Sequence, residues 1–266
     1  MRFAVVNDIH LGSPDTGYSQ GVQRKLVGEA ERLLTEFVAA MNEQVRPSFV
    51  VNLGDSIEDA GDAAVDRGYL ERVARVLGDL AMPCYSLLGN HDAHSLGPEE
   101  AAAILGGRHP YFSFDTGGFH LVALGFASAH GRAVVPDEQL EWLQDDLAAS
   151  GRSTVVFSHY GLADDSMDGN FWFDGKAEEA LIGNRGEVRG LLQQARRVRA
   201  VISAHQHWNR LLVQSSIPYF TVTSLVENTR NDGVAAGAWS VVDLDEDGIV
   251  VDVRGNDPAR LEHRFS

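Results

Sequence analysis

Leu87-Leu88-Gly89-Asn90-His91-Asp92 is the most informative segment of the 266-residue sequence. A short, mostly apolar run over 84–88 leads into it, and a run of this kind that stops at a glycine predicts a buried strand followed by a polar turn. Asn90 offers a neutral oxygen atom, and His91 offers an imidazole that titrates near neutral pH. The end of a strand holds both side chains rigidly, so the turn is a candidate site if other strands end in the same way.

Four further apolar runs do end in polar residues of the same kinds. Together with the first, the predicted strands cover 3–6, 49–53, 84–88, 154–158 and 199–203. Helical spacing of apolar residues predicts helices over 22–41 and 66–80 between the first three strands. This alternation is typical of βαβ units and a parallel sheet, whose strands present their carboxyl ends at one edge. The five strand ends carry Asp8 with His10, Asp55, Asn90 with His91, His159, and His205 with His207.

The second half of the chain predicts a second sheet. Residues 111–124 form two β-rich runs around Gly117-Gly118, which predicts a hairpin. Further helices are expected over 99–105, 136–147 and 184–197, and further strands over 211–214, 219–223, 239–244 and 249–253. Residues 18–21 and 162–183 are predicted loops, and the second, with Phe171-Trp172-Phe173, is either functional or a surface excursion held by its aromatic residues. We find no linker or repeat, so we expect a single domain over 1–266.

Composition excludes several classes of partner. With 22 basic and 38 acidic residues, the net charge is −16, which disfavours a nonspecific grip on long nucleic acid or on an anionic membrane. The single cysteine, Cys84, excludes an internal disulfide and fits a reducing compartment. The N-terminus shows no signal-peptide pattern, and no apolar run approaches about 18 residues. We therefore expect a cytoplasmic protein.

The five strand ends are more informative together than singly. A lone histidine after a strand is more often a hydrogen-bonded structural residue, and an aspartate after glycine is usually part of a turn. Here, however, five of the ten histidines fall at strand ends, beside carboxylates and an amide. This mixed donor set suits manganese, iron or zinc.

The motifs at these ends resemble, in order, the five signature blocks of the calcineurin-like metallophosphoesterase superfamily. The blocks are Asp8-Ile9-His10, Gly54-Asp55-Ser56-Ile57-Glu58, Gly89-Asn90-His91-Asp92, His159, and His205-Gln206-His207. The resemblance implies an α/β fold, namely a four-layer sandwich of two mixed β-sheets flanked by helices. Two departures, Tyr160 where the family often has proline and Ala204 where it usually has glycine, remove no ligand.

The resemblance also implies a dinuclear centre with two divalent or trivalent metal ions. One ion would be held by Asp8, His10, Asp55 and His207, and the other by Asp55, Asn90, His159 and His205. A bridging carboxylate suits Asp55, since an amide would offset two cations less well. Two metals roughly 3.5–4 Å apart can activate a shared water and stabilise the attacking and leaving oxygens of an in-line displacement.

Two further residues receive catalytic roles by the same resemblance. His91 would face the substrate and either stabilise phosphoryl oxygens or protonate the leaving alkoxide. Glu58 occupies the position whose carboxylate pairs with this histidine in related phosphatases. Such a partner would raise the imidazole pKa and fix its tautomer.

The substrate is predicted only as a class. The segment over 138–143 resembles small bacterial class III phosphodiesterases, whereas 18–24 and 223–228 resemble manganese-dependent ADP-ribose and CDP-alcohol diphosphatases. We expect hydrolysis of small phosphodiesters or nucleotide diphosphates. A phosphomonoesterase, or a noncatalytic interaction protein such as the retromer subunit that resembles these enzymes, is the alternative. Trp172 and Trp208 are candidates for stacking on a base, and Arg185 for a phosphate contact, with structural packing or a solvated surface position as the alternative for each.

Overall fold

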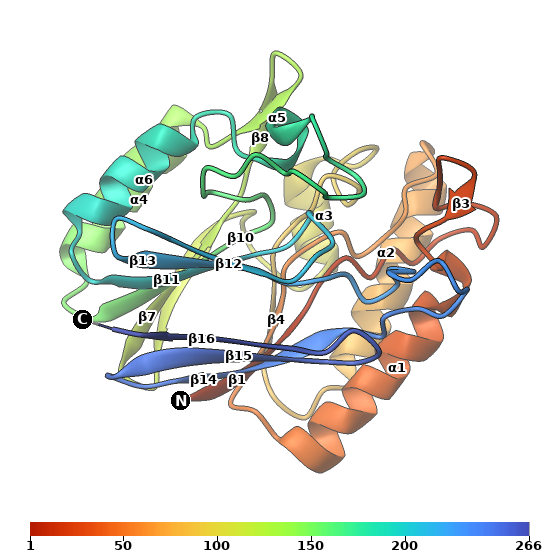
Figure 1. Cartoon of the computed structure of the whole chain (residues 1–266), viewed down its shortest axis with the longest axis horizontal. Helices are drawn as coiled ribbons and strands as arrows, with labels where there is room; N and C mark the ends of the chain where they lie inside the picture. The colour runs from red at the N-terminus through yellow and green to blue at the C-terminus, as the bar shows by residue number, and fades with distance from the viewer. Residues whose placement is uncertain (266) are drawn as a thin grey trace.

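Strand β1 (Arg2–Val6) shows how the sequence builds the layers, because its side chains point alternately into two cores. Phe3 and Val5 pack between the sheets, whereas Ala4 and Val6 pack beneath helices. The structure is a computed structural model that describes residues 1–265. Within them, two six-stranded mixed sheets lie face to face with helices on both outer sides (Figure 1). The expected four-layer α/β sandwich is confirmed.

The first sheet contains the three parallel strands that the sequence predicts near the N-terminus. β1 pairs in parallel with β4 (Val50–Asn52), which pairs in parallel with β5 (Cys84–Ser86). On the other side of β1 lie the antiparallel strands β14 (Trp239–Leu244), β15 (Gly248–Arg254) and β16 (Ala259–Arg264). Helices α1 (Ala30–Ala40), α2 (Ala63–Gly78) and α3 (Pro98–Ile104) cover its outer face.

The second sheet has four parallel strands between two antiparallel edges. In order, it contains β12 (Arg210–Gln214), β13 (Ile217–Thr221), β11 (Val198–Ser203), β10 (Ser153–Ser158), β7 (Phe119–Leu124) and β6 (Phe112–Thr116). The predicted hairpin over 111–124 is confirmed as β6 and β7. Helices α4 (Asp137–Ala149) and α6 (Arg185–Gln194) cover the outer face.

Several short elements have no counterpart in the sequence prediction. Residues 18–21, expected to be loop, begin a hairpin of β2 (Tyr18–Ser19) and β3 (Val22–Gln23), and β8 (Ala127–Ala129) pairs with β9 (Arg132–Val134). Each hairpin turns through two residues with positive φ, Gln20-Gly21 and His130-Gly131. Right-handed strand twist favours such turns. A 3-10 helix, η1 (Val27–Glu29), precedes α1, and a π-helical turn, η2 (Met41–Val45), follows it.

Other predictions need correction at their ends. The predicted loop over 162–183 contains one short helix, α5 (Ala177–Ala180). The strand expected over 219–223 lies two residues earlier, as β13, and β16 is an additional strand. Within residues 1–265, no helix combines the length and apolar character needed to cross a membrane.

Candidate metal centre

The side chains predicted from the five strand ends meet in one buried cluster, beyond the carboxyl ends of β1, β4, β5, β10 and β11. The ligand atoms of Asp8, His10 and His207 lie within 4.8 Å of one another, and so do those of Asp55, His159 and His205. Asp55 links the two groups, because its Oδ2 lies 3.4 Å from His159 Nε2 and 3.8 Å from His10 Nε2. Asn90 joins the second group, with its Oδ1 3.3 Å from His159 Nε2.

Three of the four histidines of these groups hydrogen-bond an oxygen atom through the outward ring nitrogen, and in the fourth, His10, that nitrogen lies near a carboxylate oxygen without hydrogen-bond geometry. The pairs are His10 Nδ1 with Glu58 Oε2 at 2.9 Å, His159 Nδ1 with Leu53 O at 2.9 Å, His205 Nε2 with Glu179 O at 3.1 Å, and His207 Nδ1 with Glu227 Oε2 at 2.6 Å. A proton on the outward nitrogen leaves a lone pair on the inward nitrogen, which is how a histidine is prepared to bind a metal.

The backbone at the cluster is held in an uncommon conformation. Five of the seven candidate ligands adopt positive φ angles between 47° and 65°, namely Asp8, His10, Asp55, His205 and His207. Non-glycine residues rarely adopt this region, and such strain concentrates at functional sites, where the surrounding structure enforces it.

One oxygen atom in the cluster shows that the residues fit a cation. Asp8 is fully buried, and its Oδ2 accepts hydrogen bonds from Asn7 Nδ2 at 2.5 Å and from the backbone N–H of His205 at 3.2 Å. Its Oδ1 is buried without a hydrogen-bond partner among the described residues. A buried carboxylate oxygen without a partner lowers the stability of the fold. A cation bound jointly by Asp8, His10 and His207 would supply that partner.

The carboxylates and the burial of the cluster shift the pKa values of its histidines. Burial disfavours a charge on His159 and His207, but Asp55 and Asp8 outweigh it and raise the pKa of His159 to about 9 and that of His207 to about 10. Burial lowers the pKa of His10 to about 4, with a contribution from Lys25. It lowers the pKa of His205 to about 3, with a contribution from His159. The cluster is therefore a site of strong negative potential that protons or metal ions can balance.

The turn over 89–92 packs directly on Asp55. Gly89 is required there, because a Cβ atom on it would lie 2.0 Å from Asp55 Oδ1. Asp92, for which the sequence indicates no contact, accepts hydrogen bonds from the backbone N–H groups of Ser56, Ile57 and Gly89 at 2.8, 3.2 and 2.8 Å. Asp92 thus fixes the turn that carries Asn90 against the turn that carries Asp55.

The partner of His91 differs from the expectation. His91 Nδ1 lies 2.6 Å from Asp59 Oδ2, whereas Glu58 Oε2 is 4.0 Å away. Glu58 instead binds Lys25 Nζ at 2.5 Å and contacts His10. The structure thus pairs His91 with Asp59, the residue that follows Glu58, in place of the expected Glu58.

The three candidates for substrate contact differ in position. The Trp172 ring centroid lies 5.7 Å from that of His207, so this side chain borders the cluster. Arg185 is paired with Asp164 and donates to the carbonyl of Ile182, contacts that hold the loop over 162–183. Trp208 donates to Gln206 Oε1 and carries the Arg210 guanidinium over its ring. Both Arg185 and Trp208 thus have partners within the protein, and their contact with substrate stays a prediction.

Sequence reasoning misses Asp59, Glu227 and Lys25 at the site. Asp59 follows Glu58 directly, so the acidic pair is itself the signal. Glu227 lies in the segment over 223–228, whose only sequence signal is its resemblance to diphosphatases. Lys25 has no recognisable motif, and only the fold brings it beside Glu58.

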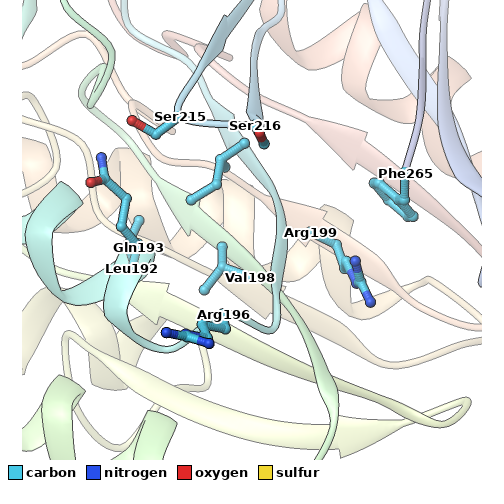
Figure 2. A pocket seen from close by; sticks show the side chains of 9 residues that line it. Leu192, Gln193, Arg196, Val198, Arg199, Ser215, Ser216 and Phe265 are labelled. Atoms are coloured by element: carbon cyan, nitrogen blue, oxygen red, sulfur yellow. The ribbon is translucent and has the colours of Figure 1, made fainter.

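Figure 2 shows the side chains that line a separate cavity, whose volume is about 240 Å³ and whose lining includes no residue of the cluster. It is lined by the end of α6, the start of β11, the turn between β12 and β13, and Phe265. Val198, in its wall, opens β11, whereas His205 follows the other end of that strand. At about 3.3 Å per strand residue, the cavity and the cluster lie at opposite ends of the sheet.

Comparison with known families agrees with the geometry. The model of the protein family described as calcineurin-like phosphoesterase matches residues 1–209. This span includes every candidate metal ligand. The chain belongs to the calcineurin-like phosphoesterase family. No curated protein gives a significant sequence match.

Several solved structures share the family fold over nearly the whole chain. A dimetal phosphatase from Danio rerio superposes with a TM-score of 0.80 at 18% identity, covering 100% of this chain and 99% of that chain. GAP50, described as the anchor in the inner membrane complex of Plasmodium, gives 0.63 at 15% identity, with 100% and 88% covered. The protein TT1561 of Thermus thermophilus gives 0.60 at 13% identity, with 96% and 98% covered. At these identities, the likeness shows the fold alone.

Proposed function

We propose that the chain is a metal-dependent hydrolase of small phosphodiesters or nucleotide diphosphates. The observation that carries the proposal is the convergence of seven candidate ligands on one buried cluster with His91 at its edge. Asp8, His10, Asp55 and His207 would hold one ion, and Asp55, Asn90, His159 and His205 the other. The donor set admits manganese, iron or zinc.

Two bound ions supply Lewis acidity, which lowers the pKa of water and stabilises charge on phosphoryl oxygens. The protein's own contribution centres on His91, whose side chain is 23% exposed and so remains accessible to substrate. Burial opposes a charge on His91, but Asp55 and the hydrogen bond to Asp59 outweigh it and raise its pKa. A raised pKa favours the imidazolium, which can protonate a leaving alkoxide or donate to a phosphoryl oxygen.

Trp172 supports a substrate with an aromatic or nucleotide portion. Its half-buried side chain lies beside His207, and a flat indole face suits stacking on a base. Lys25 Nζ lies 5.6 Å from the centroid of that ring, and its charge is balanced by Glu58 Oε2 at 2.5 Å.

Two alternatives use the same fold. A phosphomonoesterase would need the same centre, and the Danio rerio relative is described as a dimetal phosphatase. A noncatalytic role has a parallel in GAP50, which is described as an anchor. The presence of every candidate ligand and of His91 supports catalysis over that role.

The single cysteine supports a reducing, cytoplasmic setting for the enzyme.

Hydrolysis assays test the proposal. Purified protein would be supplied with manganese, iron or zinc and assayed with bis(p-nitrophenyl) phosphate, p-nitrophenyl phosphate, ADP-ribose and CDP-choline. We expect kcat/KM for a diester or a diphosphate to exceed that for the monoester. A higher value for the monoester would favour the phosphatase alternative, and no hydrolysis with any metal would overturn the proposal.

A further inference from the structure

Glu227 is a fully buried carboxylate that accepts hydrogen bonds from three distant parts of the chain. Its Oε2 lies 2.6 Å from His207 Nδ1, and its Oε1 lies 2.6 Å from Arg24 Nη2. The indole N–H of Trp172 is shared between the two oxygens, at 3.3 Å from Oε1 and 3.2 Å from Oε2. The Glu227 side chain therefore joins His207, a candidate metal ligand, to Trp172, which forms the wall of the site beside it.

The partners of Glu227 balance its negative charge and fill its hydrogen-bonding positions. A carboxylate in the protein interior is costly unless charged partners and hydrogen bonds surround it, and here both oxygens are filled. Arg24 is itself only 6% exposed, and its Nη1 donates to Thr229 O at 3.1 Å and Asn231 Oδ1 at 2.8 Å. Arg24 is thus a fixed neighbour that holds the carboxylate in place.

The contact with His207 prepares that residue to bind a metal. Donation from Nδ1 to Glu227 fixes the tautomer whose lone pair lies on Nε2. That nitrogen lies 3.4 Å from Asp8 Oδ1 and 3.2 Å from His10 Nε2. The lone pair therefore points into the first group of candidate ligands.

The same carboxylate also fixes Trp172. The middle of the loop over 162–183 is attached to the turn after β11 by Asn170, whose Nδ2 donates to Gln206 O at 2.8 Å. Asn170 Oδ1 accepts the backbone N–H groups of Trp172 and Phe173 at 2.9 and 3.0 Å. The indole contact with Glu227 then sets the direction of the ring relative to the cluster.

We propose that Glu227 is a positioning residue that links metal binding at Asp8, His10, Asp55 and His207 to the placement of the Trp172 wall. The proposal rests on the metal centre described above but requires no particular substrate. Because the contacts from His207 and Trp172 share one carboxylate, any stabilisation of one by the other must be reciprocal. Metal binding would fix the wall, and an intact wall would strengthen metal binding.

Zinc titration of the metal-stripped full chain tests this link without substrate. Calorimetry gives the affinity, and the part of the zinc-dependent indole emission that is lost in Trp172→Phe reports on Trp172 among the four tryptophans of the chain. Zinc suits this measurement because its d shell is filled. For Glu227→Gln, which keeps the shape but loses the charge, we expect zinc affinity to fall roughly 10- to 100-fold, as for other residues that orient metal-bound histidines. The exposed Glu246→Gln is the matched control and should retain wild-type affinity.

Trp172→Phe is the milder variant, because it keeps an aromatic ring but removes the indole N–H. We expect it to remove most of the zinc-dependent change in emission and to weaken zinc binding severalfold. Wild-type zinc affinity in Glu227→Gln or in Trp172→Phe would overturn the link, as would a zinc-dependent emission change in Trp172→Phe as large as that of the wild type. If Glu227→Gln does not fold, the affinity of Trp172→Phe decides. Wild-type protein that binds no zinc would instead refute the metal centre itself.

Discussion

His91 Nδ1 lies 2.6 Å from Asp59 Oδ2, a contact that holds the partly exposed imidazole at the edge of the candidate metal centre. The adjacent Glu58 serves a different histidine, His10, at 2.9 Å. Two consecutive carboxylates thus have separate tasks. Asp59 supports the histidine that we propose to face substrate, and Glu58 supports a candidate metal ligand.

This division predicts opposite outcomes for two amide substitutions. Asp59→Asn should lower kcat about tenfold or more while both metals stay bound, because His91 loses the partner that favours its charged form. Glu58→Gln should mainly lower metal affinity through His10. Metal analysis and kcat measured on both proteins check this. Equal metal loss in the two variants would show that the carboxylates do not divide their roles.

Removing His91 should separate catalysis from metal binding. His91→Ala should retain two metals but lose about 100-fold or more of its turnover, since a proton donor typically contributes that much. Asp55→Ala should lose metal, because its carboxylate lies between both ligand groups. Elemental analysis decides the matter, and a metal-depleted His91→Ala protein would contradict the assigned roles.

Trp172 should affect substrates that carry a base more than those that do not. Trp172→Ala is expected to raise KM for ADP-ribose about tenfold, because a stacking surface is lost, with a smaller effect on bis(p-nitrophenyl) phosphate. Trp172→Phe, which keeps a ring, should fall between the two proteins. A KM for ADP-ribose unchanged in Trp172→Ala would remove this residue from the substrate site.

Gly89 should tolerate no side chain. In Gly89→Ala the new Cβ would meet Asp55 Oδ1 and the Asp55 backbone N–H group, so we expect a loss of about 1–3 kcal/mol in the free energy of unfolding and weaker metal binding. Gly68→Ala is the control, since that position in α2 has open space around it and alanine favours a helix. Urea denaturation measures both. Equal stability of Gly89→Ala and wild type would argue against the tight turn.

The strand ends are predictable because their signals are local. Apolar runs that stop at Asp8, Asp55 and Asn90 predict buried parallel strands, and the shared edge of such a sheet brings their ends together. β16 escapes prediction because it is an edge strand in which charged residues such as Arg260 and Glu262 alternate with partly buried ones. Its alternation is polar enough to resemble a surface tail.

The carboxylates that support the histidines are harder to predict. Whether Glu58 or Asp59 reaches His91 depends on the path of the backbone after Ile57, which sequence spacing does not determine. Glu227 reaches His207 from a later segment through the fold alone, and nothing local relates it to Trp172. Ligands that follow strands are therefore visible in the sequence, whereas residues that orient them are visible only in three dimensions.

The most direct test of the dinuclear hydrolase is the rate of bis(p-nitrophenyl) phosphate hydrolysis as manganese is added stepwise to metal-stripped protein. Because both ligand groups share Asp55, we predict that activity rises and reaches a plateau at two equivalents of metal per chain. A plateau at one equivalent, or no metal-dependent activity at any ratio, would contradict the account.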